Sequence, residues 1–302
     1  MKATKTRKRK LKQRNRGSNK LQGRRTVKSR IRGGVKRPLS LLNIDDINKK
    51  YTENKPMAKA AAIDDFIVSK RLDANDVIEI RQSILPVHPD NIVSLFGKEF
   101  IDGNKHVSAR NLNNGVHYFK TRVFLHKDFP DTQLIKLYEY TDDSLDFVFA
   151  YEAFIQKQAE AITDCDVQIP KVYRCGKYIL QNPETGFDKY YFFIVMEKFN
   201  FDSLRDYLIK HANQMHNCET IADKINRANN CLNDHGIRHG DLNVGNIFIK
   251  PTTDTDEDIS IGLIDFGQAG PSTPSSPLDE DYSCDKLHRL AERLQTTVSP
   301  RE

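Results

Sequence analysis

The sequence predicts an α+β fold in which a small antiparallel β lobe is followed by a helical lobe. Residues 107–125 form two apolar runs around Asn113-Asn114-Gly115, and an Asn-Gly pair of this kind is typical of a tight β hairpin. Residues 144–162 instead repeat apolar side chains every three to four positions, which indicates a helix. Beyond residue 198 the helical pattern prevails, so the strands belong to the first lobe and most of the helices to the second.

Five strands and one helix are predicted for the β lobe. The strands are expected at residues 107–112, 116–125, 133–138, 167–178 and 190–196, with the helix 144–162 between the third and the fourth. Three strands, one helix and two strands are enough for a small antiparallel sheet that carries a helix on one side.

Helices are predicted on both sides of this lobe in the chain. Before it, one helix includes residues 58–68 and another begins after Asp73, and nothing in their pattern indicates more than a packing role. After it, helices are expected at residues 203–211, 219–232 and 282–295.

Composition excludes several classes of protein. The chain has 302 residues, of which 38% are hydrophobic and 29% charged, and it has no apolar run near the roughly 18 residues that span a bilayer. No apolar stretch follows the basic amino terminus, so we expect no secretory signal. The five cysteines form no Cys-x-x-Cys pair, and we expect free thiols and an intracellular location, cytoplasmic or nuclear.

Positive charge is concentrated at the amino terminus. The first 37 residues hold 17 of the 47 Lys and Arg residues and no Asp or Glu, which leaves 30 basic and 41 acidic residues in the rest. A segment so basic and so poor in apolar residues is predicted to be a disordered arm. Contact with nucleic acid, nuclear targeting, and a solubilising or autoinhibitory tail all remain open for it. The expected organisation is therefore an arm at 1–37, a helical extension at 38–95 and a two-lobed domain at 96–298, divided near residue 197.

The residues with the clearest chemistry lie between positions 239 and 267. His239-Gly240-Asp241-Leu242-Asn243-Val244-Gly245-Asn246 is followed by two apolar strands and then by Asp265-Phe266-Gly267. This order places Asp241, Asn246 and Asp265 on loops at one end of a β hairpin, where they can converge. Carboxylate and amide oxygens suit Mg²⁺ and its phosphate ligands, so Asn246 and Asp265 are candidate metal ligands. Asp241 is then left to orient or deprotonate an attacking hydroxyl.

These segments resemble the catalytic loop and the Asp-Phe-Gly metal motif of the protein-kinase-like superfamily. The resemblance implies a two-lobed fold with a truncated helical second lobe, and ATP and Mg²⁺ as cofactors. It also implies a strand lysine that holds the α and β phosphates, which Lys136 matches, and a helical carboxylate paired with that lysine, which Glu152 matches. Glu139 and Glu160 are the rival carboxylates.

The resemblance extends to the nucleotide side of the site. Residues 194–199 resemble the hinge, so Met196 is expected behind the adenine and the backbone of residues Glu197 to Phe199 at its edge. The glycine-rich loop is reduced to Asn113, Asn114 and Gly115, with Gly115 standing 21 residues before Lys136. Fewer glycines allow fewer backbone amides to approach the phosphates, which predicts weaker nucleotide binding or a lower rate.

Several positions depart from the pattern of most protein kinases. Gly240 replaces an arginine that reads a phosphorylated activation loop, and Asn243 replaces a lysine near the transferring phosphoryl group. His-Gly-Asp is more typical of the RIO kinases, the KEOPS-complex kinase of tRNA modification, lipopolysaccharide kinases, and aminoglycoside and choline phosphotransferases. Only 35 residues follow Gly267, with space for one helix, on which Asp285 resembles the buried acid that bonds the catalytic-loop backbone. The helical platform for extended peptides is expected to be missing.

The function expected from these features is that of an atypical serine/threonine protein kinase. Its substrate would be a protein, such as a basic protein or the chain itself, with nucleic acid as a further partner through residues 1–37 and no membrane partner. A small-molecule phosphotransferase on the same fold is one alternative, and a pseudokinase scaffold that binds nucleic acid through the arm is another. The compact form with a basic arm would also suit a kinase of a large DNA virus, carried in the virion.

Overall fold

The computed structural model describes residues 56–100, 106–112, 115–181, 188–212, 217–251, 259–273 and 281–298. The chain divides into two units, residues 1–37 and 38–302, and all that follows concerns the second. The predicted basic arm, the first part of the predicted extension, and the turn residues Asn113 and Asn114 lie outside the described residues.

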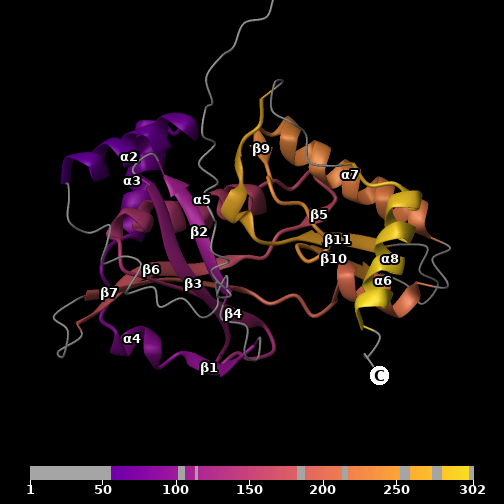
Figure 1. The fold of residues 1–302 in the computed structure, drawn as a ribbon, viewed down its shortest axis with the longest axis horizontal. Coiled ribbons are helices and arrows are strands. Elements are labelled where there is room, and N and C mark those ends of the chain that lie inside the picture. Colours follow the sequence, from indigo (N-terminus) through magenta and orange to yellow (C-terminus); the bar gives the residue numbers. More distant parts are fainter. Residues whose placement is uncertain are drawn as a thin grey trace, which may run out of the picture. The chain divides into compact units, whose positions relative to one another are not determined.

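The first lobe is built on a six-stranded antiparallel sheet (Figure 1). Its strand order is β1-β3-β4-β7-β6, and β2 pairs with β3 as the predicted hairpin. The strands are β1 (Phe96–Glu99), β2 (His106–Leu112), β3 (Gly115–His126), β4 (Gln133–Tyr140), β6 (Val172–Gln181) and β7 (Asp188–Glu197).

Three helices of this lobe pack together beside the sheet. They are α2 (Pro56–Ser69), α3 (Ala74–Ser83) and α5 (Asp146–Glu160), and the short helices α4 (Asp90–Val93) and η2 (Asp143–Leu145) complete the lobe. Asp73 begins α3 as predicted, because its side chain accepts from the backbone N–H of Asp76 while the Asp76 side chain accepts from that of Asp73. Helix α5 is buried along most of its length and forms the centre of the lobe.

The first turn of α5 is fixed to the sheet by a buried carboxylate. Asp146 accepts hydrogen bonds from Lys177 on β6 and from the Tyr140 hydroxyl on β4. Both carboxylate oxygens of Asp146 therefore have partners, as a buried charge requires. The contact sets the orientation of the helix that carries Glu152.

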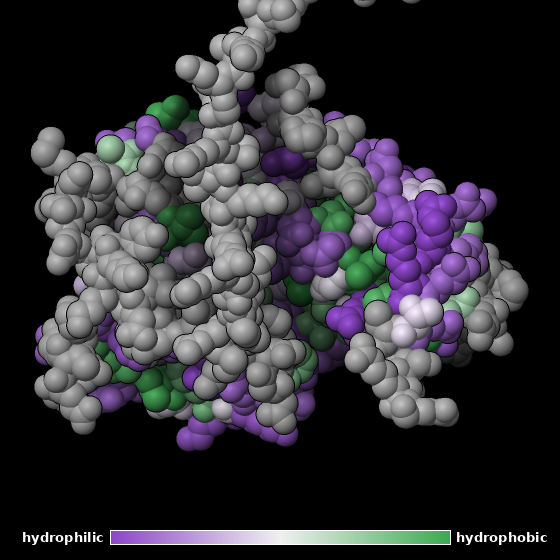
Figure 2. Space-filling model, viewed as in Figure 1, coloured by the Kyte–Doolittle hydropathy of each residue, from purple (hydrophilic) through white to green (hydrophobic). Residues whose placement is uncertain are grey.

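The second lobe combines helices with two small sheets. Strands β5 (Val167–Gln168), β11 (Ile259–Leu263), β10 (Ile247–Pro251) and β8 (Asp202–Ser203) form one sheet in that order, and β9 (Ile237–Arg238) pairs with β12 (Gly270–Pro271). The remaining elements are α6 (Leu204–His211), α7 (Cys218–Asp234), η3 (Phe266–Gln268) and α8 (Cys284–Val298). Figure 2 shows hydrophilic residues gathered over α8, whose Leu287 and Ala291 are buried on the other side.

The α+β fold class and most predicted elements are confirmed, and the exceptions have local causes. The strand expected at 167–178 is two strands, because Pro170 has no N–H for a ladder and the chain passes there from β5 in one sheet to β6 in another. Strand β1 was not predicted, and its pairing with β3 is irregular.

The prediction of free thiols is wrong for four of the five cysteines. Cys165 is bonded to Cys231 and Cys218 to Cys284, which leaves Cys175 as the free thiol. The two disulfides tie the last and first turns of α7 to the segment before β5 and to α8. Each pair is separated by 66 residues, so no short motif in the sequence reveals it.

No helix in the described ranges is long and apolar enough to cross a bilayer.

Candidate functional site

A lysine at the centre of the first sheet joins two carboxylates from separate parts of the chain. Lys136 lies on β4, paired with Val123 on β3 and Ile194 on β7. Its Nζ is 2.7 Å from Oε1 of Glu152 on α5 and 2.9 Å from Oδ1 of Asp265. Glu152 is thus paired with Lys136 as expected. Neither of the rival carboxylates, Glu139 and Glu160, forms an ion pair with Lys136 among the described residues.

The charges of this group are stabilised by one another. Burial alone would lower the pKa of the Lys136 ammonium, but the carboxylates of Asp265 and Glu152 outweigh it and hold the pKa well above its usual value. The same ammonium lowers the pKa of Asp265. Lys136 is therefore charged and Asp265 ionised at neutral pH.

A fourth member of the group, Tyr138, was not foreseen. Its hydroxyl donates to Oε2 of Glu152 at 2.6 Å, and both side chains are almost completely buried. Burial, reinforced by the nearby Glu152 carboxylate, raises the pKa of Tyr138 well above its usual value, so the hydroxyl stays a donor. Lys136 and Tyr138 are two positions apart and so share one face of β4, which is the signal that could have identified the tyrosine.

Asp265 has a strained backbone that directs its side chain. It adopts a left-handed conformation (φ 65°, ψ 68°) as the residue before η3, and its carboxylate accepts from the Gly267 N–H. A non-glycine residue in this region costs free energy and persists where surrounding contacts hold it. One such contact is next in the chain, where the Ile264 carbonyl is 2.9 Å from Nε2 of His239.

The loop that carries Asp241 requires glycine at position 240. Gly240 has φ 80°, and a Cβ at this position would lie only 2.5 Å from the Gln268 carbonyl oxygen. The close approach packs this loop against η3, the helix that begins after Asp265. A residue with a side chain at position 240 would therefore clash with Gln268.

Two amides hold the Asp241 carboxylate. Asn243 donates to Oδ1 at 2.9 Å, and Asn246 donates to Oδ2 at 3.2 Å and to the Asp241 carbonyl at 2.9 Å. The Asn246 N–H₂ is thereby directed at Asp241, which leaves its amide oxygen for another ligand. The Asn246 carbonyl in turn accepts from the N–H of Ile264, next to Asp265. Asp241 itself is exposed to solvent, while Asn246 is buried.

These side chains line a cavity of about 580 Å³ between the two lobes of the second unit. Its lining includes eight residues that the sequence pointed to: Lys136, Glu152, Met196, Glu197, Phe199, Asp241, Asn246 and Asp265. Gly115 begins β3 opposite Leu112 at the end of the hairpin. The cavity has the size usual for a small-molecule site.

The predicted hinge has one backbone donor to offer. The N–H of Glu197 bonds to the Lys171 carbonyl, and that of Lys198 to the Thr132 carbonyl. The Phe199 N–H has no partner among the described residues, so it can donate to a planar base. Phe199 also packs edge to face against Phe248, with ring centroids 5.6 Å apart, and both residues line the cavity.

The predicted role of Asp285 is wrong. Asp285 is exposed on α8, and the contact expected of it comes from Tyr282, whose buried hydroxyl donates to the Leu242 carbonyl at 3.1 Å. Tyr282 lies just before the helix, where the chain passes closer to the loop. A search for an acid at this position could not find a tyrosine.

Two other groups of side chains contain Cys and His close together. One consists of Asp164, His235 and the Cys165–Cys231 pair, and the other of His288 and the Cys218–Cys284 pair. Such groups could hold a metal ion, but the sulfurs here are bonded to each other as disulfides.

Part of the chain matches a known protein family. Residues 177–300 match the model of the lipopolysaccharide kinase (Kdo/WaaP) family, which lies within the protein-kinase-like superfamily. Comparison with curated proteins finds no match. The matched residues include Asp241, Asn246 and Asp265.

This match corrects the expected activity. We predicted a serine/threonine protein kinase, but the matching family is named for kinases of a glycolipid, whose acceptor hydroxyls are not those of protein side chains. The likeness to the RIO, KEOPS-complex and viral kinases is not supported either. The chain is thus similar over residues 177–300 to the lipopolysaccharide kinase family and has the kinase-like two-lobed fold of the superfamily that contains it.

Proposed function

We propose that the protein transfers the γ-phosphoryl group of ATP to a hydroxyl group of a sugar or sugar-containing small molecule. The observation that carries the proposal is the meeting of Lys136, Glu152 and Asp265 in one cavity with the solvent-exposed Asp241. The match to a lipopolysaccharide kinase family supports a carbohydrate as the acceptor.

Each group has a chemical role that suits its surroundings. The Lys136 ammonium, kept charged by Asp265 and Glu152, binds the α and β phosphates. The Phe199 N–H and the rings of Phe199 and Phe248, which line the cavity, hold the adenine. Asp241 orients the acceptor hydroxyl and receives its proton as the acceptor oxygen bonds to the γ phosphorus and ADP leaves.

The donor set fits Mg²⁺. The Asn246 amide oxygen and the Asp265 carboxylate are hard oxygen ligands, and the two residues are joined through the Ile264 N–H. When bound there, Mg²⁺ would neutralise phosphate charge as the transition state forms. Because the lowered pKa of Asp265 keeps it ionised, this ligand needs no deprotonation before it binds the metal.

Asn243 also fits a carbohydrate acceptor better than a charged residue would. Its amide is engaged with Asp241 and with the Gly245 N–H, so it fixes the loop without adding a positive charge beside the acceptor. Asp241 is then the ionisable side chain of this loop that faces an incoming hydroxyl.

The test compares acceptor classes under one condition. The full chain is incubated with γ-labelled ATP and Mg²⁺ together with lipopolysaccharide core oligosaccharide, free monosaccharides or a basic protein. We expect label in the carbohydrate, lost in Asp241→Asn and Asp265→Asn but kept in Asp285→Asn, a matched change at an exposed aspartate. Transfer to the protein alone, or label that survives in both site variants, would overturn the proposal.

A further inference from the structure

A lysine joins the end of helix α2 to the segment that follows Asp265. Lys70 follows the last residue of α2, and its Nζ donates to the Ala269 carbonyl at 2.6 Å, across 199 residues of sequence. Ala269 is completely buried and lies four residues after Asp265, between η3 and β12. A residue of the predicted packing extension thus bonds directly to the segment that carries a candidate metal ligand.

The Lys70 ammonium is surrounded by residues of α2, α5 and β12. Its Nζ is 5.6 Å from the ring centroid of Phe66 on α2 and 5.2 Å from that of Tyr151 on α5. Both distances are within the range of a cation–π contact. A Cβ at Gly270 would lie 3.2 Å from Nζ, so the glycine leaves the space that the ammonium occupies.

The residue after Lys70 has an unfavourable backbone conformation. Helix α2 ends in a Schellman motif, in which the Arg71 N–H bonds to the Val68 carbonyl and the Leu72 N–H to the Ile67 carbonyl. The left-handed position of this motif is usually glycine, but here it is Arg71 with φ 54°. The turn fixes the direction of Lys70 as it leaves the helix.

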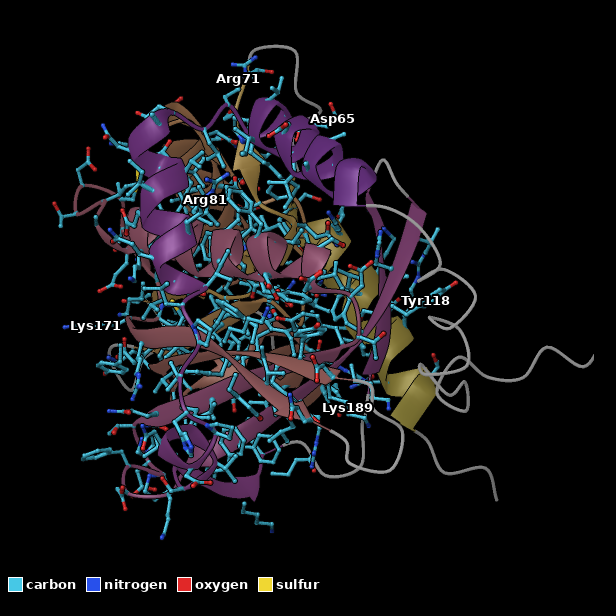
Figure 3. The ribbon with its side chains drawn as sticks, turned by 90° about the vertical axis from the view of Figure 1, so that its left-hand side faces the viewer. Asp65, Arg71, Arg81, Tyr118, Lys171 and Lys189 are labelled. Carbon is cyan, nitrogen blue, oxygen red and sulfur yellow. A yellow bond between two sulfur atoms is a disulfide. The ribbon has the colours of Figure 1, made fainter. Side chains whose placement is uncertain are left out.

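The aromatic rings beside the Lys70 ammonium also pack against one another. The Phe66 ring contacts Phe147 and Tyr151 edge to face, at centroid distances of 6.0 and 5.3 Å. Tyr151 precedes Glu152, the partner of Lys136. In Figure 3, α2 and α3 lie beside α5, with Asp65 labelled on α2 and Arg71 just after its end.

The segment that Lys70 holds also touches the loop of Asp241. Strand β12 begins at Gly270 and pairs with β9, which ends one residue before His239. The Gln268 carbonyl is the group that excludes a Cβ at Gly240. Movement of residues 266–271 would therefore displace both sides of the site.

We propose that Lys70 is a positioning residue, which joins α5 to the segment after Asp265 and so keeps Glu152, Asp265 and Asp241 in one arrangement. The extension is then part of the catalytic assembly, although it contacts no reacting atom. The expected effect of Lys70 on kcat rests on the proposed phosphoryl transfer. Its expected effect on the structure around Asp265 does not.

The experiment uses the full chain with Lys70→Met and, as a matched loss of positive charge, Arg81→Gln at an exposed position of α3. We expect Lys70→Met to lower kcat on the order of 10- to 100-fold, with KM for ATP changed less than about threefold, because misplaced groups slow chemistry more than they weaken binding. Hydrogen exchange of residues 259–273 should become faster in Lys70→Met and stay unchanged in Arg81→Gln.

A second variant keeps the test decisive if Lys70→Met does not fold. Gly270→Ala leaves the lysine in place but puts a methyl group against its Nζ, and it should give a smaller change of the same kind. Unchanged exchange of residues 259–273 in the folded variant would overturn the inference. So would unchanged kcat beside an active wild-type chain, whereas an inactive wild-type chain with faster exchange in the variant would refute the proposed function alone.

Discussion

Removing the Tyr138 hydroxyl tests the buried network that supports Lys136. In Tyr138→Phe, Oε2 of Glu152 loses a donor at 2.6 Å in a place where Glu152 is only 2% exposed, so water cannot easily replace it. A hydrogen bond to a charged group contributes about 1.5 to 3 kcal/mol, and we expect a loss of about 2 kcal/mol in the free energy of unfolding. For a chain of this size that corresponds to a fall in Tm of roughly 4 to 8 °C.

The assay is thermal unfolding of wild type, Tyr138→Phe and Tyr173→Phe. Tyr173 is 45% exposed on β6, so the loss of its hydroxyl should change the free energy of unfolding by less than about 0.5 kcal/mol. The rate of phosphoryl transfer should fall together with Tm in Tyr138→Phe, since Glu152 holds Lys136. A Tm for Tyr138→Phe equal to that of Tyr173→Phe would refute the reasoning.

Three further predictions concern the disulfides, acid stability and the loop before Asp241. Unfolded without reductant, the chain should show one reactive thiol, Cys175, and after reduction all five; five thiols before reduction would contradict the pairing. Burial would raise the pKa of Asp142, but hydrogen bonds from His117 and Ser144 lower it to about 2, below its ordinary 3.8. The carboxylate therefore contributes stability above pH 4 that is lost as pH falls toward 2, roughly 2 kcal/mol or less, and acid titration of unfolding should show this loss in wild type but not in Asp142→Asn. Gly240→Ala should cost at least about 2 kcal/mol more than Gly236→Ala in urea unfolding, because both glycines have φ near 80° but only the former meets a neighbouring atom; equal costs would contradict the steric account.

The sequence predicted the residues of the candidate site better than the residues that hold them in position. Asp241, Asn246 and Asp265 belong to short segments with fixed spacing, so the order of the motifs along the chain was enough to infer their convergence. Lys136 and Glu152 followed from the resemblance to the protein-kinase-like superfamily, which left Glu139 and Glu160 as rival carboxylates.

The residues that hold the site in position depend on contacts between segments that are far apart in the sequence, and the spacing of motifs does not reveal such contacts. Tyr282 replaces an expected acid by reaching the same carbonyl from a different backbone position. Lys70 bonds to Ala269, which is 199 residues away in the sequence, and the cysteine pairs also join distant segments. None of these contacts has a local sequence pattern.

The choice of acceptor was also beyond the motifs. The loop around Asp241 is shared by kinases of proteins and of small molecules, and the expectation of a protein substrate was corrected by the family match rather than by a residue.

The most direct test of the account separates nucleotide binding from chemistry in Asp241→Asn. Binding of ATP with Mg²⁺ is measured by calorimetry, and transfer of label to the carbohydrate acceptor is followed in the same preparation. The account predicts a dissociation constant for ATP within about threefold of wild type and a transfer rate lowered by roughly 10² to 10⁴, the range for loss of a general base. Transfer at the wild-type rate, or loss of ATP binding in a folded variant, would contradict it.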